Sequence, residues 1–282
     1  MLLDILILLV GLGTLILGGE VLVRGATRMA LRFRVSTLVV GLTIVAFSTS
    51  APELLVSIKA AFKNVPDFAL GNIVGSNISN LALVLGVAAL IGNIPIDKIT
   101  ARRAWPTTFI ASSILYLFAQ DGTLQHYEGY ILFGLLIVYL AYLFVYTKKD
   151  QIKLDVEGPK ANEGRFEKYK DGGLMVLGAV CLYFGSEWFI IGGESLATDL
   201  GVSERIIGLT VLAMGTSLPE LITSIIAAKT GDTNLAMGNL LGSNIFNILS
   251  ILGITTIIKE LSVNEEILRT DMLWMLILTF GI

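Results

Sequence analysis

The chain has 282 residues, of which 54% are hydrophobic and 15% are charged, whereas soluble domains carry about 25% charged residues. Its apolar residues form nine runs near the length of about 20 residues that a membrane-spanning helix needs. This composition excludes an ordinary soluble domain and indicates an all-α polytopic membrane protein. The net charge of −3 carries little information, because membrane orientation follows the charge of the loops.

The first apolar run begins at the N-terminus. It lacks a basic leading segment and a small-residue cleavage site, so we expect a transmembrane helix and not a signal peptide. The last run is still apolar at Ile282, where a helix that begins near Leu268 has not yet crossed the bilayer. In chain order, the expected helices are residues 3–27, 36–61, 68–91, 104–120, 128–147, 172–197, 203–228, 235–258 and 268–282.

Lys and Arg are distributed unevenly among the connections between these helices. The odd-numbered connections hold 15 and the even-numbered ones hold 5, which together are all 20 basic residues. Because cytoplasmic loops carry an excess of positive charge, this predicts a multi-pass protein of the cell membrane with its N-terminus outside. The longest connection, 148–171, is then a solvated cytoplasmic linker, too short for a folded regulatory domain of roughly 50 residues.

Residues that serve enzyme chemistry are scarce. The single histidine, His126, falls in a short loop and is expected to be solvated, and the single cysteine, Cys181, lies in an apolar run and cannot form an internal disulfide. No His-Glu-x-x-His pattern occurs, so an intramembrane metalloenzyme is not expected. We therefore expect no enzyme activity, no cofactor and no nucleic-acid partner.

The chain aligns with itself without gaps after a shift of 167 residues. Between residues 11 and 86, 31 of 76 positions are identical to their shifted counterparts. Each copy holds five expected helices, and because five is odd the second copy enters the membrane upside down, an inverted-topology repeat typical of secondary transporters. We expect a first repeat at 1–147, the linker at 148–171, and an incomplete second repeat at 172–282. The same shift predicts ten helices, with the last one and part of the ninth missing from this sequence.

Two glutamates lie at equivalent positions in the middle of apolar runs, Glu53 and Glu220. An acidic residue at the centre of a membrane helix costs roughly 3 kcal/mol on insertion scales. Two carboxylates near each other must be protonated or neutralised by a cation. A structural role, with each carboxylate bonded to a neighbouring helix, is the alternative, but two repeat-equivalent glutamates beside proline favour a cation site.

Each glutamate follows a proline, Pro52 or Pro219. Proline lacks a backbone donor and clashes with the carbonyl four residues earlier, so the helices are expected to break and to free the carbonyls of Ser48 and Gly215. Broken backbone at membrane depth lines a cavity or is buried in protein. Freed carbonyls beside carboxylates suit calcium, which binds six to eight oxygens. Further carbonyls expected to be freed are those around Ala46, Thr49, Ala213 and Thr216.

A second repeated motif supplies more polar side chains. Ser76 and Asn80 are four residues apart and share a helical face, as do Ser243 and Asn247. Small residues in the same motif favour close helix packing instead, which we expect for its glycines. Ser50 and Ser217, three residues before the glutamates, can line the same cavity. Four further asparagines remain open between ligand and helix–helix hydrogen bond: Asn72, Asn77, Asn239 and Asn244.

These motifs resemble a known family. Ala-Phe-Ser-Thr-Ser-Ala-Pro-Glu at 46–53 and Ala-Met-Gly-Thr-Ser-Leu-Pro-Glu at 213–220 are similar to the two alpha-repeat signatures of the sodium/calcium exchangers. The Gly-Asn-x-x-Gly-Ser-Asn-Ile stretches at 71–78 and 238–245 are similar to the second halves of those signatures. The resemblance covers nearly the whole chain and implies ten helices, as in prokaryotic-type members without a regulatory domain.

The resemblance implies four cation positions arranged as a diamond. Calcium would bind Glu53 and Glu220, with backbone oxygens from Thr49 and Thr216, and Asn80 and Asn247 would face this central position. Two sodium ions would flank it. Their implied partners are Ala46, Thr49, Ser217, Ser243 and Glu220 for one, and Ala213, Thr216, Ser50, Ser76 and Glu53 for the other.

One position separates branches of the family. Several microbial members and the potassium-dependent branch carry aspartate where this chain has Asn247, whereas animal plasma-membrane exchangers carry asparagine. With two carboxylates only, exchange at the family's usual ratio of three sodium ions for one calcium ion would move net charge, and potassium dependence is not expected. A calcium/proton antiporter of the same superfamily and a cation channel are the alternatives. The oligomeric state is open, and a monomer is compatible with the sequence.

Overall fold

The computed structural model describes residues 1–63, 66–92, 94, 100–150, 165–202 and 213–282. Helices make up nearly all of these residues, and the two short strands among them, β1 (Thr123–Leu124) and β2 (Leu261–Ser262), pair antiparallel. The expected all-α architecture is therefore confirmed. Most of the linker expected at 148–171 and the first part of the helix expected at 203–228 lie outside the described residues.

Five of the described helices are long and apolar enough to cross a membrane, and a bent pair forms a sixth candidate. The bent pair joins Thr37–Thr49 to Ala51–Phe62 at an angle of 45°. The other expected spans are present as the shorter helices α7 (Trp105–Phe118), α12 (Leu218–Lys229) and α15 (Met272–Gly281). The five long spans are Leu2–Phe33, Phe68–Ile91, His126–Val145, Lys170–Asp199 and Thr233–Ile258.

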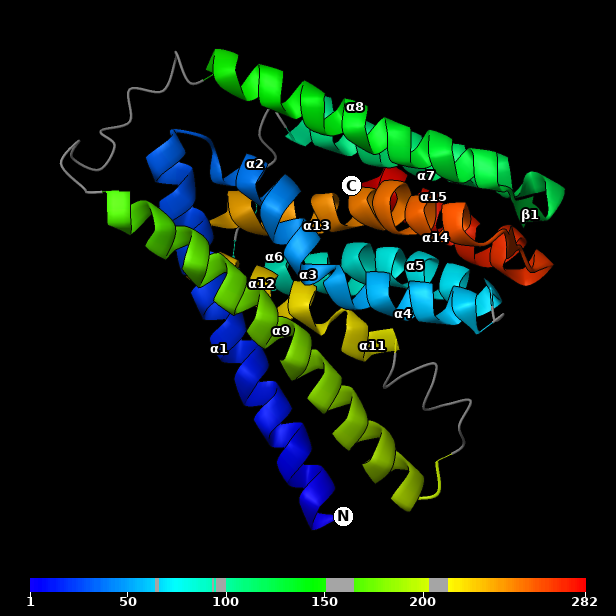
Figure 1. Cartoon of the computed structure of the whole chain (residues 1–282), viewed down its shortest axis with the longest axis horizontal. Coiled ribbons are helices and arrows are strands. Elements are labelled where there is room, and N and C mark those ends of the chain that lie inside the picture. The colour runs from blue at the N-terminus through cyan, green and yellow to red at the C-terminus, as the bar shows by residue number, and fades with distance from the viewer. Residues whose placement is uncertain (64–65, 93, 95–99, 151–164, 203–212) are drawn as a thin grey trace.

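The two longest helices, α1 (Leu2–Phe33) and α9 (Arg165–Asp199), lie side by side and extend away from the remaining helices (Figure 1). Both are longer than predicted: α1 continues past residue 27, and α9 begins seven residues before 172. The predicted limits were set by hydropathy, which marks only the membrane-embedded part of a helix. The charged ends of both helices extend beyond that apolar part.

Glycines bring α1 and α9 into close contact. A Cβ atom on Gly11 would lie 2.6 Å from the backbone nitrogen of Phe189, and one on Gly18 would lie 2.8 Å from the Cβ atom of Cys181. Because the earlier glycine of α1 meets the later residue of α9, the two helices run antiparallel. They are equivalent under the 167-residue shift, so this orientation is what an inverted repeat requires.

The repeat also appears in the local structure, since equivalent elements begin 167 residues apart. This includes short π-helical turns, which are uncommon and often lie at functional sites. The pairs are α3 (Ala46–Thr49) with α11 (Ala213–Thr216), α4 (Ala51–Phe62) with α12, α5 (Pro66–Ser79) with α13 (Thr233–Phe246), η2 (Asn80–Val84) with η7 (Asn247–Leu252), and η3 (Thr100–Ala104) with η8 (Ile267–Asp271).

The most central span consists of α13, η7 and α14 (Gly253–Ile258). In its most apolar stretch 83% of the residues are buried, against 28% for α1. It packs against α2 (Thr37–Val40), η1 (Gly41–Val45) and α3. Gly238 lies directly against the carbonyl oxygen of Leu38, where a side chain would overlap the backbone. The packing role expected for this motif glycine is therefore present.

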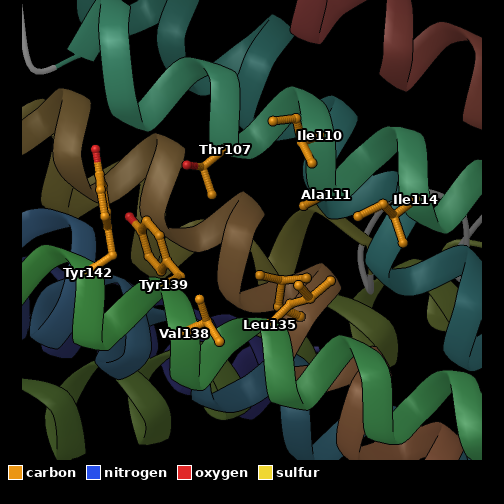
Figure 2. A pocket seen from close by; sticks show the side chains of 9 residues that line it. Thr107, Ile110, Ala111, Ile114, Leu135, Val138, Tyr139 and Tyr142 are labelled. Carbon is orange, nitrogen blue, oxygen red and sulfur yellow. The ribbon is translucent and has the colours of Figure 1, made fainter.

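The helix α8 (His126–Asp150) covers η7 and α14 on one side of the molecule. Between α7 and α8 lies a groove of about 300 Å³, whose lining Figure 2 shows. It contains Leu249 of η7 and many aliphatic side chains, and its Ile110 and Val138 are among the exposed hydrophobic residues. Since no charged side chain lines it, this groove is a lipid-facing surface feature and not a cation site.

Polar contacts fasten one end of the α1–α9 pair. The Arg32 guanidinium lies 2.9 Å from the Asp171 carboxylate, which joins the end of α1 to α9. The Asp232 carboxylate accepts hydrogen bonds from Thr37 Oγ1 at 2.6 Å and from Thr27 Oγ1 at 3.1 Å. It also caps α13 by accepting from the Leu235 backbone N–H at 3.2 Å. A single carboxylate thus joins α1, α2 and α13.

Candidate cation-binding site

Two helix breaks form the frame of the candidate site. The helix α3 ends at Thr49 and α4 begins at Ala51, while α11 ends at Thr216 and α12 begins at Leu218. The linking residue has nearly the same backbone angles in both copies, φ −84° and ψ 9° at Ser50 and φ −87° and ψ 1° at Ser217. Proline at the second position of α4 and of α12 cannot donate to the preceding turn, so each break follows from the Pro-Glu motif.

The breaks place both glutamates in the first turn of a helix. Glu53 lies in the first turn of α4 and Glu220 in the first turn of α12, with 1% and 0% of their surfaces exposed. At this position backbone N–H groups lack helical partners, and the helix dipole favours negative charge. The two glutamates lie near each other, because Ser50, three residues before Glu53, donates a hydrogen bond to Glu220 Oε1 at 2.9 Å. They therefore belong to one buried site.

Hydroxyl groups surround the Glu220 carboxylate. Ser50 Oγ donates to Glu220 Oε1 at 2.9 Å, and Ser243 Oγ donates to the same oxygen at 3.3 Å. Thr49 Oγ1 lies 3.3 Å from Ser243 Oγ and donates to Asn239 Oδ1 at 3.0 Å. Since Ser50 and Thr49 come from the first copy and the others from the second, the two copies build this half of the site together.

The Glu53 carboxylate has a different environment. Among the described residues no side chain donates a hydrogen bond to it, and Ser217, the repeat equivalent of Ser50, donates to Ser76 Oγ at 3.3 Å instead. The resemblance implied that Ser217 would accompany Glu220 and that Ser50 would accompany Glu53. In the structure Ser50 contacts Glu220, and Ser217 contacts Ser76.

Four buried oxygens without a hydrogen-bond partner belong to the residues predicted to face the centre of the site. They are Glu53 Oε2, Glu220 Oε2, Asn80 Oδ1 and Asn247 Oδ1. A buried acceptor that is left unpaired costs about 1–3 kcal/mol, and more if it is charged. Carboxylate and amide oxygens are ligands of hard cations such as calcium, and a bound cation would supply the partner that these oxygens lack. No group of three or more His, Cys, Asp or Glu side chains suited to a metal occurs among the described residues.

Two of the backbone carbonyls expected to be freed by the prolines have donors. The carbonyl oxygen of Gly215 accepts from Ser186 Oγ of α9 at 2.8 Å. The carbonyl oxygen of Ala46 accepts from the Ser50 N–H at 3.0 Å and lies 3.2 Å from Thr49 Oγ1. The side chain of Ala213 lies outside the described part of the chain, and Thr216 is buried.

The asparagines that the sequence left open act as hydrogen-bonding residues. Asn239 donates to Ser224 Oγ at 3.1 Å while its own oxygen accepts from Thr49. Asn72 donates to Ser57 Oγ at 3.3 Å, and Asn77 and Asn244 bond across the two copies. Spacing alone could not distinguish these roles. Ser186 was not predicted, because its repeat equivalent is Gly19 and it is therefore not one of the polar residues that recur in both copies.

Comparison with known proteins points to one family. The profile of the sodium/calcium exchanger protein family matches residues 3–145 and 171–282. The chain is 32% identical over 300 residues to the sodium/calcium exchanger MaX1 of Methanosarcina acetivorans, covering 93% of this chain and 85% of that protein. A shorter match, 55% identical over 65 residues, links 23% of this chain to 10% of the sodium/potassium/calcium exchanger 2 of Gallus gallus.

The fold is similar to that of a solved exchanger. The sodium-calcium exchanger NCX_Mj, in crystals soaked with 10 mM Na⁺ and no Ca²⁺, superimposes with a TM-score of 0.85 at 30% sequence identity. The alignment covers 99% of this chain and 90% of that structure.

Proposed function

The chain belongs to the sodium/calcium exchanger family, and we propose that it exchanges sodium for calcium by alternating access at a site built around Glu53 and Glu220. As a member of that family it is a multi-pass membrane transporter for cations and not an enzyme. The site residues, the stoichiometry and the orientation in the membrane are parts of the proposal.

The observation that carries the proposal is the set of four unpaired oxygens on Glu53, Glu220, Asn80 and Asn247. Their burial makes the empty site unfavourable, because one oxygen of each carboxylate and both amide oxygens have no protein donor. A single calcium ion balances the charge of two carboxylates. Sodium ions can compete for the same oxygens and for the neighbouring hydroxyls, so that either set of ions neutralises the site.

Competition between sodium and calcium for the same oxygens explains why the protein would exchange these ions and would not let them leak across the membrane. An empty site with two buried negative charges resists the crossing step, whereas a neutralised site allows the gating helices to move. We assign this movement to α1 and α9, which pack against the site-bearing helices and extend beyond them at one end (Figure 1). With two carboxylates, loading three sodium ions leaves one positive charge, so exchange at three sodium ions for one calcium ion is electrogenic.

The proposed exchange does not depend on potassium. Asn247 supplies no third negative charge, which argues against a site for an additional cation. The short match to a sodium/potassium/calcium exchanger leaves a potassium-dependent cycle as the alternative. A calcium/proton antiporter is the second alternative, but Ser50, Ser243 and Thr49 place hydroxyl oxygens beside Glu220, and these suit sodium.

Membrane orientation follows from the basic residues. The proposed N-terminus is outside and residues 148–171 are cytoplasmic, which places the Arg32–Asp171 ion pair at the cytoplasmic end of α1 and α9. Cysteine labelling from either side of a sealed vesicle tests this orientation, using the natural Cys181 replaced by serine and a new cysteine in the linker. Protection of the linker cysteine in intact cells and labelling in inverted vesicles is the expected result.

The function is tested by calcium uptake into proteoliposomes. An outward sodium gradient should drive uptake, a proton gradient should not, and external potassium should leave the rate unchanged. Glu53→Gln and Glu220→Gln should each abolish it. Proton-driven uptake without sodium would establish the antiporter alternative, and calcium flux that needs no counter-ion would establish a channel.

A further inference from the structure

Four asparagines of the repeated motif form a hydrogen-bonded ring where α5 continues into η2 and α13 continues into η7. Asn80 Nδ2 donates to Asn244 Oδ1 at 3.0 Å, and Asn247 Nδ2 donates to Asn77 Oδ1 at 3.0 Å. Asn77 Nδ2 donates to the backbone carbonyl of Asn244 at 3.5 Å, and Asn244 Nδ2 donates to the backbone carbonyl of Asn77 at 3.4 Å. All four side chains are buried, with at most 1% of their surface exposed.

The backbone carbonyls determine how every amide in this ring is oriented. A carbonyl can only accept, so Asn244 must direct its NH₂ group to the Asn77 carbonyl, which leaves its oxygen facing Asn80. Asn80 must then direct its own NH₂ group to that oxygen. Turning any one amide over would place two acceptors or two donors against each other. The orientation of each amide therefore follows from hydrogen bonding alone.

The orientation of the ring leaves two amide oxygens, those of Asn80 and Asn247, without a partner. Because the NH₂ groups of Asn80 and Asn247 donate hydrogen bonds within the ring, their Oδ1 atoms point away from it, buried and without a hydrogen-bond partner. These are two of the four oxygens that face the proposed cation. An amide turned the other way would present NH₂ groups, which repel a cation.

We infer that Asn77 and Asn244 are positioning residues that hold the Asn80 and Asn247 oxygens available for the transported cation. The inference rests on the proposed function, because it assigns a task within that site. It separates the asparagines by role: Asn80 and Asn247 touch the ion, whereas Asn77 and Asn244 act through them. Each positioning residue comes from the opposite copy to the ligand that it orients, so the ring also fixes α5 against α13.

The ring predicts specific pairs of coupled residues. Asn244→Ala removes the acceptor for Asn80, but Asn77 keeps its acceptor role for Asn247, since the Asn244 backbone carbonyl remains. Asn77→Ala does the reverse. Asn244 should therefore couple with Asn80, and Asn77 should couple with Asn247, whereas Asn244 with Asn247 and Asn77 with Asn80 should act independently.

The experiment measures the Ca²⁺ concentration dependence of sodium-driven uptake by the full chain in proteoliposomes, together with Ca²⁺ titration of the purified protein. Asn80→Ala and Asn244→Ala should each weaken apparent Ca²⁺ affinity about 10-fold, the order expected for one buried polar interaction. The double variant should be within about threefold of Asn80→Ala alone, because Asn244 has nothing left to orient. Asn72→Ala, which removes an asparagine of the same motif outside the ring, is the matched control and should change affinity less than about twofold.

The outcomes separate this inference from the proposed function. If the effects of Asn80→Ala and Asn244→Ala multiply in the double variant, or if Asn244→Ala leaves Ca²⁺ affinity unchanged, the positioning role is refuted while the exchanger stands. If the unaltered protein neither binds nor transports Ca²⁺, both are refuted. The equivalent cycle of Asn77 with Asn247 gives a second test, and serine replacements repeat both cycles should the alanine variants fail to fold.

Discussion

The two copies of the repeat have the same local structure but unequal contacts around their glutamates. Both helix breaks have nearly the same backbone angles, and the equivalent π-helical turns η2 and η7 both begin at an asparagine. Yet Glu220 accepts hydrogen bonds from Ser50 and Ser243, whereas Glu53 has no such donor among the described residues. A repeated sequence therefore fixes the parts of the site without making its two halves alike.

This inequality is meaningful for a transporter of the inverted-repeat type. In such proteins two copies exchange conformations when the site changes the side to which it opens. A single state should then show one glutamate engaged by hydroxyls and the other free for an incoming ion. The asparagine ring, by contrast, is symmetric, which suits an element that stays in place while the halves around it change.

The largest expected effect comes from removing either carboxylate. Glu53→Gln and Glu220→Gln each leave one buried charge facing the ion, and losing one partner of a buried charge pair costs about 2–5 kcal/mol, so transport should fall by about 30-fold or more. Uptake of radioactive calcium by proteoliposomes measures this. Glu20→Gln is the control and should retain transport, because Glu20, whose repeat equivalent is Glu187, pairs with Arg24 on the exposed surface of α1. Normal exchange by either site variant would remove that glutamate from the site.

The serines test the inequality itself. Ser50→Ala removes a hydrogen bond to a carboxylate, whereas Ser217→Ala removes one between two hydroxyls. Hydrogen bonds to charged groups contribute about 1.5–3 kcal/mol and neutral ones about 0.5–1.5 kcal/mol, so Ser50→Ala should weaken sodium affinity by about tenfold more. The sodium dependence of calcium uptake gives both values. Equal effects would show that the unequal contacts belong to one state only and average out over the cycle.

The helix breaks and the packing of α1 against α9 could both be predicted from the sequence. The Pro-Glu motif predicts a helix break because proline lacks an N–H group, and the break occurs at Ser50 and Ser217 in the structure. The antiparallel packing of α1 and α9 agrees with the odd number of helices per repeat that the sequence predicts. These features depend on local chemistry and on counting, both of which a sequence contains.

The unpredicted features depend on where side chains from different helices meet. The sequence could not show that Ser50 reaches Glu220 or that Asn77 and Asn244 bond to each other's backbone, since both contacts join residues about 170 positions apart. The match between the two copies also does not identify Ser186. Ser186 donates a hydrogen bond to the Gly215 carbonyl beside the helix break, but its repeat equivalent is Gly19, so it is not a polar residue that the two copies share.

Asp232 extends the comparison from the site to the ends of the helices. It joins α1, α2 and α13 through three hydrogen bonds, and its repeat equivalent is Val65, which can form no such bonds. Asp232→Ala should lower the free energy of unfolding by about 1–2 kcal/mol, because a helix cap and two side-chain contacts are lost. Thermal unfolding in detergent measures this, and Asp199→Ala, at a more exposed position near the end of α9, is the control. An unchanged melting temperature would show that these contacts contribute nothing net to stability.

The smallest expected effect tests a contact that exists in one copy only. Ser186 of α9 donates to the Gly215 carbonyl, next to the break that precedes Glu220, so it links a proposed gating helix to the site. Ser186→Ala removes one neutral hydrogen bond, and the maximal rate should change by at most about 10-fold with little change in calcium affinity. Ser186→Thr keeps the hydroxyl and should restore the rate, which a packing role alone would not explain. A change in affinity with an unaltered rate would instead place Ser186 in ion binding, and the gating role would be withdrawn.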